Sequence, residues 1–379
     1  MNIHIKYKIN DLIFYIACSM LFMVEAIEDT SLIKSLKFMR SIICFLLLSK
    51  LICTCWTKRD LIVVVYLNLL GILSWIWSGD YTIFITIIVI MASKDIQIKK
   101  TLKISFWIYL TFFALHILGV IIGRLDTGLI YVLDDGIRKR YGLGYGHPNV
   151  AHSIVLTIIF LGLLAYKDSL KTYHYVLFII FNLVMYHFTD SRTGMLLVCL
   201  GIIGAYIVHI ISKFKLEKYI DVIVQNKIIK FLTSNIFILL TILSVVASIM
   251  YTKYGMFNNL GTLSSRFLTA SRVIENNAIT LFGQRNIKTD LGYIYILYRY
   301  GIVFWSIVLV AYSMLLRRMI ESKLYTECIM IICFAAYSMV ENFTGSILAN
   351  ITLIFMSFLI YPNNLAIYIK NNSSSGQTY

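Results

Sequence analysis

Long apolar runs alternate with short polar connections from one end of the chain to the other. Runs of about 20 residues recur throughout, and a helix needs about 20 residues to cross the hydrocarbon core of a bilayer. The pattern predicts an all-α polytopic integral membrane protein with about twelve transmembrane helices. We place these spans near residues 10–27, 38–56, 60–78, 80–93, 103–122, 150–166, 173–188, 193–212, 234–252, 291–316, 324–340 and 346–363. The fourth span is short, which favours a tilted or re-entrant segment.

Basic residues are concentrated in alternate connections, such as "SKDIQIKKTLK" and "KFKLEKYIDVIVQNKIIK". The positive-inside rule therefore predicts that both termini are cytoplasmic. Two long connections then face outward, at about residues 123–149 and 253–290. We expect one integral membrane domain over residues 1–366 and a polar cytoplasmic tail over 367–379.

The composition agrees with this membrane assignment. Hydrophobic residues make up 59% of the 379 residues and charged residues only 14%, against about 25% in soluble domains. The net charge of +15 is attributed mainly to topology, and no stretch of interleaved basic and aromatic residues suggests nucleic-acid binding. The seven cysteines lie almost entirely in apolar runs, without the spacing of a disulfide framework or zinc site.

The outer face carries more cations than the predicted topology requires. The first long loop contains Arg124, Arg138, Lys139 and Arg140, and the second contains Lys253, Arg266, Arg272, Arg285 and Lys288 against Glu275 and Asp290. These cations either contact anionic lipid headgroups and solvent, or bind a phosphorylated substrate through the planar guanidinium fork.

Two short segments place polar groups at predicted helix starts. In "TDSRTGMLL", Ser191 is expected to cap a helix that has Arg192 in its first turn, where a bound anion would offset the helix dipole. In "GYGHPNVAH", the glycines allow a turn, Pro148 begins the helix and His147 lies at its outer end. His152 is expected to be a packed membrane histidine.

Arg299 is predicted about 13 Å into its span, counting 1.5 Å per residue. An ionisable group at that depth is a candidate functional residue, with Glu341 as its candidate partner. No carboxylate pair or histidine cluster has clear metal-ligand spacing. We therefore expect neither a metal nor another cofactor.

Three patches resemble the Wzy-type polysaccharide polymerases, within the superfamily that includes the O-antigen ligases. "GLGYGHPN" is similar to the glycine-rich HPN segment of these polymerases, and "TDSRTGMLL" to the superfamily's motif at a helix start. "SSRFLTASRVIENNAITLFGQ" with "DLGYIYILYRYGIVFW" resembles the large-loop pattern, in which Arg272 and Gly283 match an Arg-x10-Gly motif. The patches cover about a quarter of the chain. Unlike the ligases, this chain has no histidine after the loop; Asp290 stands there.

The resemblance implies a metal-independent glycosyltransferase of capsule, exopolysaccharide or O-antigen biosynthesis in the cell membrane. A growing glycan on undecaprenyl diphosphate would be transferred to the next lipid-linked repeat unit on the outer face. The expected partners are undecaprenyl-diphosphate-linked oligosaccharide, membrane lipids, and a chain-length regulator and flippase of the same pathway, with no nucleic acid.

Residue roles follow as hypotheses from this resemblance. The expected catalytic residues are His147, Arg192, Arg272 and Asp290, and the expected substrate- or diphosphate-binding residues are Arg138, Arg140, Asn149, Arg266, Arg299 and Glu341. Asp290 and Glu341 compete with His147 as the base. A ligase that attaches finished glycan to another acceptor, or a flippase for the same lipid-linked glycan, is the alternative function.

Overall fold

Helices form nearly all the regular structure of the computed structural model, which describes residues 3–28, 37–133, 137–256, 262–342 and 344–373. Within these ranges seven helices are long and apolar enough to cross a membrane, or eight if one bent pair forms a single span. The prediction of a helical, polytopic membrane protein is thereby confirmed. The total of about twelve spans, their orientation and the two outer loops remain predictions.

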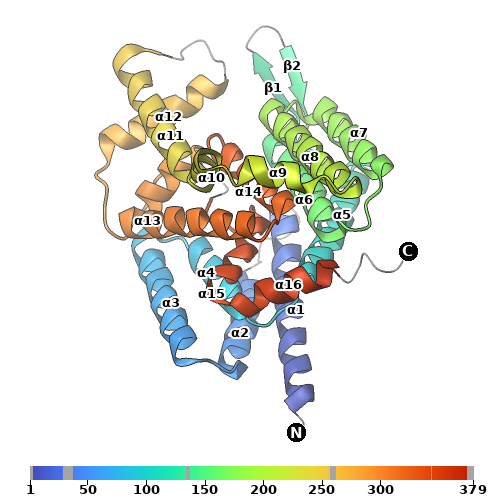
Figure 1. Cartoon of the computed structure of the whole chain (residues 1–379). Helices are drawn as coiled ribbons and strands as arrows, with labels where there is room; N and C mark the ends of the chain where they lie inside the picture. The colour runs from blue at the N-terminus through green and yellow to red at the C-terminus, as the bar shows by residue number, and fades with distance from the viewer. Residues whose placement is uncertain (1–2, 29–36, 134–136, 257–261, 343, 374–379) are drawn as a thin grey trace. The chain divides into compact units, whose positions relative to one another are not determined.

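Figure 1 shows the order of the elements along the chain. They are α1 (Ile3–Glu28), α2 (Lys37–Cys53), α3 (Lys58–Ser78), α4 (Thr82–Ala92), α5 (Ile98–Ile121), β1 (Ile130–Leu133), β2 (Ile137–Arg140), α6 (Pro148–Tyr166), α7 (Thr172–Thr189), α8 (Arg192–Lys213), α9 (Glu217–Val224), α10 (Lys227–Ser234), α11 (Ile236–Tyr254), α12 (Thr262–Asn276), α13 (Gly292–Glu321), α14 (Tyr325–Tyr337), η1 (Ile351–Met356), α15 (Ser357–Ile360) and α16 (Pro362–Ser373).

The chain divides into two compact units, each made from segments that are not consecutive. Unit 1 comprises Met1–Trp56, Ile88–His209 and Tyr361–Tyr379, and unit 2 comprises Thr57–Ile87 and Ile210–Ile360. Each unit is described separately below.

Several expected spans form shorter or interrupted elements. Helix α4 has 11 residues, which corresponds to about 16 Å of rise and is less than a bilayer core. The span expected at 346–363 is instead a 3-10 helix, a short α-helix and a separate helix that begins at Pro362. Asn350 starts the 3-10 helix by accepting from the Thr352 N–H while donating to the Tyr312 hydroxyl, and Pro362 has no N–H with which to continue the preceding helix.

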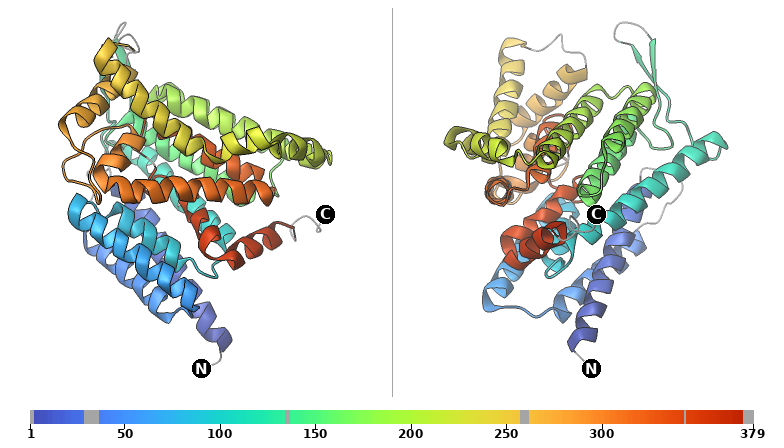
Figure 2. Two further views of the ribbon diagram at one scale, coloured as in Figure 1. Left: turned by 60° about the vertical axis from the view of Figure 1, so that its left-hand side comes forward. Right: turned by 45° about the vertical axis from the view of Figure 1, so that its right-hand side comes forward.

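In unit 1, helix α6 is buried on almost all sides, with contacts to α5 and α7. The antiparallel hairpin β1–β2, which pairs Ile130 with Arg140, stands out beyond the first turn of α6 (Figure 2). The glycine-rich turn after it packs on α5 through Tyr145, which stacks on His116 with 4.5 Å between ring centroids. A Cβ at Gly142 would lie 2.2 Å from the Tyr145 carbonyl oxygen, so this motif needs glycine for close backbone packing.

In unit 2, helix α13 is broken at Gly301, whose φ of 86° and ψ of 166° are not helical. The segment 280–284 fills the break with backbone hydrogen bonds. The N–H groups of Ile302 and Val303 donate to the carbonyls of Thr280 and Leu281, and the Gln284 N–H donates to the carbonyl of Arg299. The neighbouring segment therefore pairs two N–H groups and one carbonyl of the helix at its break.

Two glycines make this contact possible. Gly283 has a φ of 95°, and a Cβ there would lie 2.2 Å from the Arg299 carbonyl oxygen. A Cβ at Gly301 would lie 2.4 Å from both the Gly283 nitrogen and the Leu281 carbonyl oxygen. The "LFG" turn and the "YRYG" segment of the sequence are thus two sides of one backbone contact.

We expect Gly283→Ala to destabilise the protein more than Gly123→Ala. Both glycines have positive φ, but nothing lies within 4 Å of a Cβ at Gly123. Alanine at Gly123 therefore adds backbone strain of about 1 kcal/mol, whereas alanine at Gly283 must also displace the helix backbone. Thermal unfolding of the purified protein in detergent measures both variants, and equal decreases in Tm would contradict the proposed contact.

Candidate anion-binding sites

In unit 1, His147 is the N-cap of α6, and the helix begins at Pro148 as predicted. Its Nδ1 accepts a hydrogen bond from the Asn149 N–H at 3.1 Å. A backbone N–H only donates, so in neutral His147 the proton is on Nε2. With Nδ1 engaged in this way, the ring is held at the helix start, which supports a positioning role better than a role as general base.

Arg140, at the end of β2, is buried against the same helix start. Its Nε donates to the carbonyl of Thr189 at 3.0 Å, and its Nη2 donates to Oδ1 of Asn149 at 2.6 Å. Thr189 is the last residue of α7, so the cation lies at the negative end of a helix dipole. Arg138 lies on β2, but its side chain is outside the described part of the structure. His152 is fully buried, as expected, with its Nδ1 2.9 Å from the Thr189 hydroxyl.

Arg192 begins α8, as the sequence predicts. Its side chain is 69% exposed, and its Nε lies 3.8 Å from Oδ1 of Asp190. The nearest charge that the structure shows for it is therefore a carboxylate of the chain itself, which partly offsets the unfavourable position of a cation in a first helical turn.

In unit 2, the expected pairing of Glu341 with Arg299 is wrong. Oε1 of Glu341 instead accepts from Nη2 of Arg266 at 2.6 Å. Arg266 projects from α12, which packs through Phe267, Ala270 and Val273 into a hydrophobic cluster with α11 and α13. Its Nη1 is buried without a hydrogen-bond partner, so the guanidinium keeps a donor for a further acceptor.

Arg272 and Asp290 are both exposed. Arg272 follows Arg266 by six residues, a rotation of about 240° around α12, so the two arginines face different sides of the helix. Asp290 lies just before α13, whose Gly292 N–H donates to the Ser338 carbonyl at the end of α14. Asp290 thus precedes the start of α13, and Glu341 follows the end of α14. These two helix ends contact each other through this hydrogen bond.

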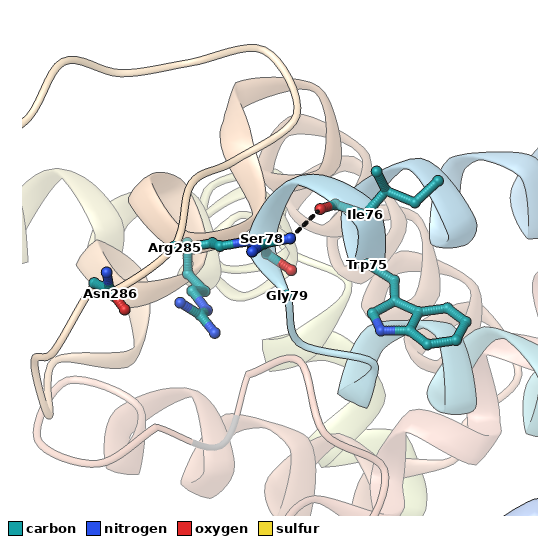
Figure 3. A pocket seen from close by; sticks show the side chains of 7 residues that line it. Trp75, Ile76, Ser78, Gly79, Arg285 and Asn286 are labelled. Carbon is teal, nitrogen blue, oxygen red and sulfur yellow. Dashed lines mark hydrogen bonds between the residues drawn. The ribbon is translucent and has the colours of Figure 1, made fainter.

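Arg299 lies two residues before the break in α13 and lines a pocket of about 550 Å³ with Arg285. The remaining lining residues are Trp75, Ile76, Ser78, Gly79 and Asn286. Figure 3 shows Arg285 reaching the last turn of α3, where its Nη2 donates to the Ile76 carbonyl at 3.5 Å. The Nε of Arg299 is buried without a partner. Among the described residues neither arginine forms an ion pair, so the pocket presents two cations to a ligand.

Asp80 holds the wall of this pocket in place. It follows Gly79 in the turn between α3 and α4, and its Oδ2 accepts from the hydroxyls of Tyr300 at 2.7 Å and Tyr295 at 3.2 Å. Its Oδ1 accepts from the backbone and side chain of Thr82. Burial alone would raise the pKa of Asp80, but these hydrogen bonds together lower it below the usual value. The carboxylate is thereby kept ionised and held by the tyrosines, which flank Arg299 in the sequence, and among the described residues it forms no ion pair with Arg285 or Arg299.

The sequence interpretation counted Arg285 among the outer-face cations without selecting it as a site residue, and it assigned no role to Asp80, Tyr295 or Tyr300. Arg285 follows the "LFGQ" turn by one residue, and Asp80 lies in the short connection between two apolar runs, α3 and α4. An acid in a short connection and two tyrosines five residues apart are available signals, but nothing in the sequence indicates that they meet. Their sequence separation is more than 200 residues.

No family model, curated protein or solved structure matches this chain. The candidate sites are therefore interpreted from their own chemistry.

We expect Asp80→Asn to lower the stability of the protein by about 2 kcal/mol at pH 7, because hydrogen bonds to a charged carboxylate are replaced by weaker ones. The folded-state pKa of Asp80 is depressed, so the wild-type advantage is present above the unfolded pKa of about 3.9. It is lost as pH falls through the lower folded pKa. Thermal unfolding in detergent from pH 7 to 3 should show the two proteins converging below about pH 4.

The exposed Glu275→Gln substitution removes a carboxylate outside this network and is the matched control. It should leave the stability unchanged at every pH. A difference between wild type and Asp80→Asn that stays constant across the range would contradict the proposed role of the carboxylate charge.

Proposed function

We propose that this protein is a membrane glycosyltransferase that polymerises lipid-linked oligosaccharide repeat units. A hydroxyl of the acceptor repeat unit attacks the anomeric carbon of the growing glycan, and the bond from that carbon to undecaprenyl diphosphate breaks. The hydroxyl proton passes to a base, and the diphosphate leaves on its lipid carrier. The products are one longer lipid-linked glycan and free undecaprenyl diphosphate.

The observation that carries this proposal is the pocket lined by Arg285 and Arg299. A diphosphate leaving group gains negative charge as the glycosidic bond breaks, and preorganised cations stabilise that charge. Arginine suits this role because its planar fork donates two parallel hydrogen bonds to phosphate oxygens. The clamp formed by Asp80 and the two tyrosines supplies the rigidity that preorganisation requires.

The remaining site residues have separate roles in the proposal. Arg266 offers its unpaired buried Nη1 to the same class of anion, and Arg272 is an exposed cation of unit 2 that meets the incoming lipid diphosphate. Arg192 is an exposed cation of unit 1 and is not assigned to this pocket. In unit 1, Arg140 fixes Asn149, whose N–H in turn holds the ring of His147 at the start of α6. Asp290, an exposed carboxylate, is assigned as the base, since Glu341 is engaged by Arg266.

Topology supports placing this reaction on the outer face of the cell membrane. The pocket's Arg285 belongs to the connection between α12 and α13, which the distribution of lysines and arginines assigns to the outside. The donor and the acceptor of the proposed reaction are both lipid-linked, so an integral membrane protein is the expected catalyst.

A flippase for the same glycan is the second candidate, because transporters place substrates at breaks in their helices. The break in α13 supports it. However, transporter breaks use freed backbone groups to bind ions or substrates, whereas here Thr280, Leu281 and Gln284 occupy those groups at Gly301. The observation therefore favours a fixed pocket over an ion-coupled transport site.

We expect Arg299→Lys and Arg285→Lys each to reduce polymer formation at least tenfold, because lysine keeps the charge but loses the bidentate fork. Each variant replaces the wild-type gene in the source strain, and surface polymer is separated by size on gels. Single lipid-linked repeat units should accumulate while the protein remains in the membrane. Arg318→Lys, at the far end of α13, is the matched control and should give a normal ladder.

Purified protein supplied with lipid-linked repeat units from that strain separates the candidate functions. A ladder of products identifies a polymerase, a single attachment to a foreign acceptor identifies a ligase, and movement without new glycosidic bonds identifies a flippase. A normal ladder from both arginine variants would remove the pocket from the mechanism.

A further inference from the structure

The connection between α8 and α11 contains two short helices, α9 and α10, each of eight residues. Both α8 and α11 are long and apolar enough to cross a membrane. An eight-residue helix rises only about 12 Å and cannot cross the hydrocarbon core. If α8 and α11 are spans, α9 and α10 therefore begin and end at the same face of the membrane.

The two helices repeat one pattern nine residues apart. Lys218 precedes Tyr219, Val222 and Ile223 in α9, just as Lys227 precedes Ile228, Phe231 and Leu232 in α10. The spacing i, i+3 and i+4 places each apolar triplet on one side of its helix. All six apolar side chains are exposed, including Val222 at 75% and Phe231 at 64%. Each helix thus presents an apolar face that the rest of the described chain does not cover.

On the opposite side, an ion pair fixes each helix to the segment that joins α13 to α14. Asp221 of α9 accepts from Lys323 and from the hydroxyl of Tyr325, and Lys230 of α10 donates to Glu321 at 2.9 Å. Asp221 and Lys230 are again nine residues apart. These contacts tie both helices to the turn between α13 and α14, so the apolar faces are held in place.

The net charge of residues 213–235 is positive, with five lysines against Glu217 and Asp221. Glu217 is hydrogen-bonded to the Ser212 hydroxyl, and Glu321 also binds Arg317. Four lysines, Lys213, Lys215, Lys218 and Lys227, are exposed and form no ion pair among the described residues. An apolar face bordered by lysines is the pattern of a helix that lies in the plane of a membrane interface.

We propose that α9 and α10 lie in the headgroup region of one membrane leaflet and bind acidic phospholipids. The six apolar side chains insert toward the acyl chains, and the four lysines contact the lipid phosphates. Charge complementarity selects the lipid: each lysine near an anionic surface adds to the attraction, whereas zwitterionic headgroups offer no net charge. This surface is independent of the glycan-transfer site.

Lipid titration of the purified full-length protein tests the proposal. We expect short-chain phosphatidylglycerol to raise the Tm in detergent and phosphatidylcholine to leave it unchanged. Replacing the four lysines by glutamine should weaken the apparent affinity for phosphatidylglycerol by about tenfold or more. The matched control replaces four exposed lysines elsewhere, Lys58, Lys100, Lys103 and Lys171, and should bind like wild type. Equal losses in the two variants, or an equal Tm rise with inorganic phosphate, would overturn the proposal.

Insertion of the apolar face is measured separately, so that a folding defect in the lysine variant does not decide the result. A cysteine at Val222, in a protein with Cys53→Ser and Cys55→Ser, is compared with one at Lys253 in phosphatidylglycerol vesicles. A water-soluble thiol reagent should modify the Val222 position at least tenfold more slowly. Equal rates would mean that the face is open to water, as for a soluble protein partner, and would exclude the lipid assignment.

Discussion

A break in a membrane-spanning helix must leave its backbone N–H and C=O groups paired, and this constraint organises unit 2. In a bilayer each unpaired group costs several kcal/mol, so the interruption of α13 at Gly301 requires a second piece of backbone to supply partners. Segment 280–284 does so at the cost of two positions where only glycine fits. Arg285 follows this segment by one residue and Arg299 precedes the break by two. The same backbone contact therefore brings both arginines to one pocket.

The hydrogen bonds around Asp80 hold its carboxylate at the turn between α3 and α4, and among the described residues it forms no ion pair with Arg285 or Arg299. A carboxylate near two arginines would normally pair with one of them. Asp80 instead accepts hydrogen bonds from Tyr295, Tyr300 and Thr82, which also lower its pKa. In the proposed reaction this separation matters, because an arginine already neutralised by a carboxylate stabilises a leaving diphosphate less than an unpaired one.

Periodicity and capping rules predicted the features that depend on neighbouring residues. The apolar runs gave the membrane helices, and Pro148 and Arg192 begin helices where their local signals place them. Features that depend on distant residues were missed or wrong. Glu341 pairs with Arg266 and not with Arg299. The prediction failed because no sequence signal indicates which arginine a distant carboxylate will contact. The expected straight span at 346–363 is broken because Asn350 and Pro362 override its hydropathy.

The depth of Arg299 illustrates why such errors matter for function. A continuous helix would place this arginine well inside the hydrocarbon, where a charge demands a partner and suggests a transport pathway. The break at Gly301 changes that inference, since Arg299 ends a helical segment, faces a pocket and lies next to a packed loop. A charged residue in an apolar run can thus belong to a fixed binding pocket when the backbone around it departs from the helix. Here the helix can break because Gly301 and Gly283, on the two sides of the backbone contact, leave room for the two segments to meet.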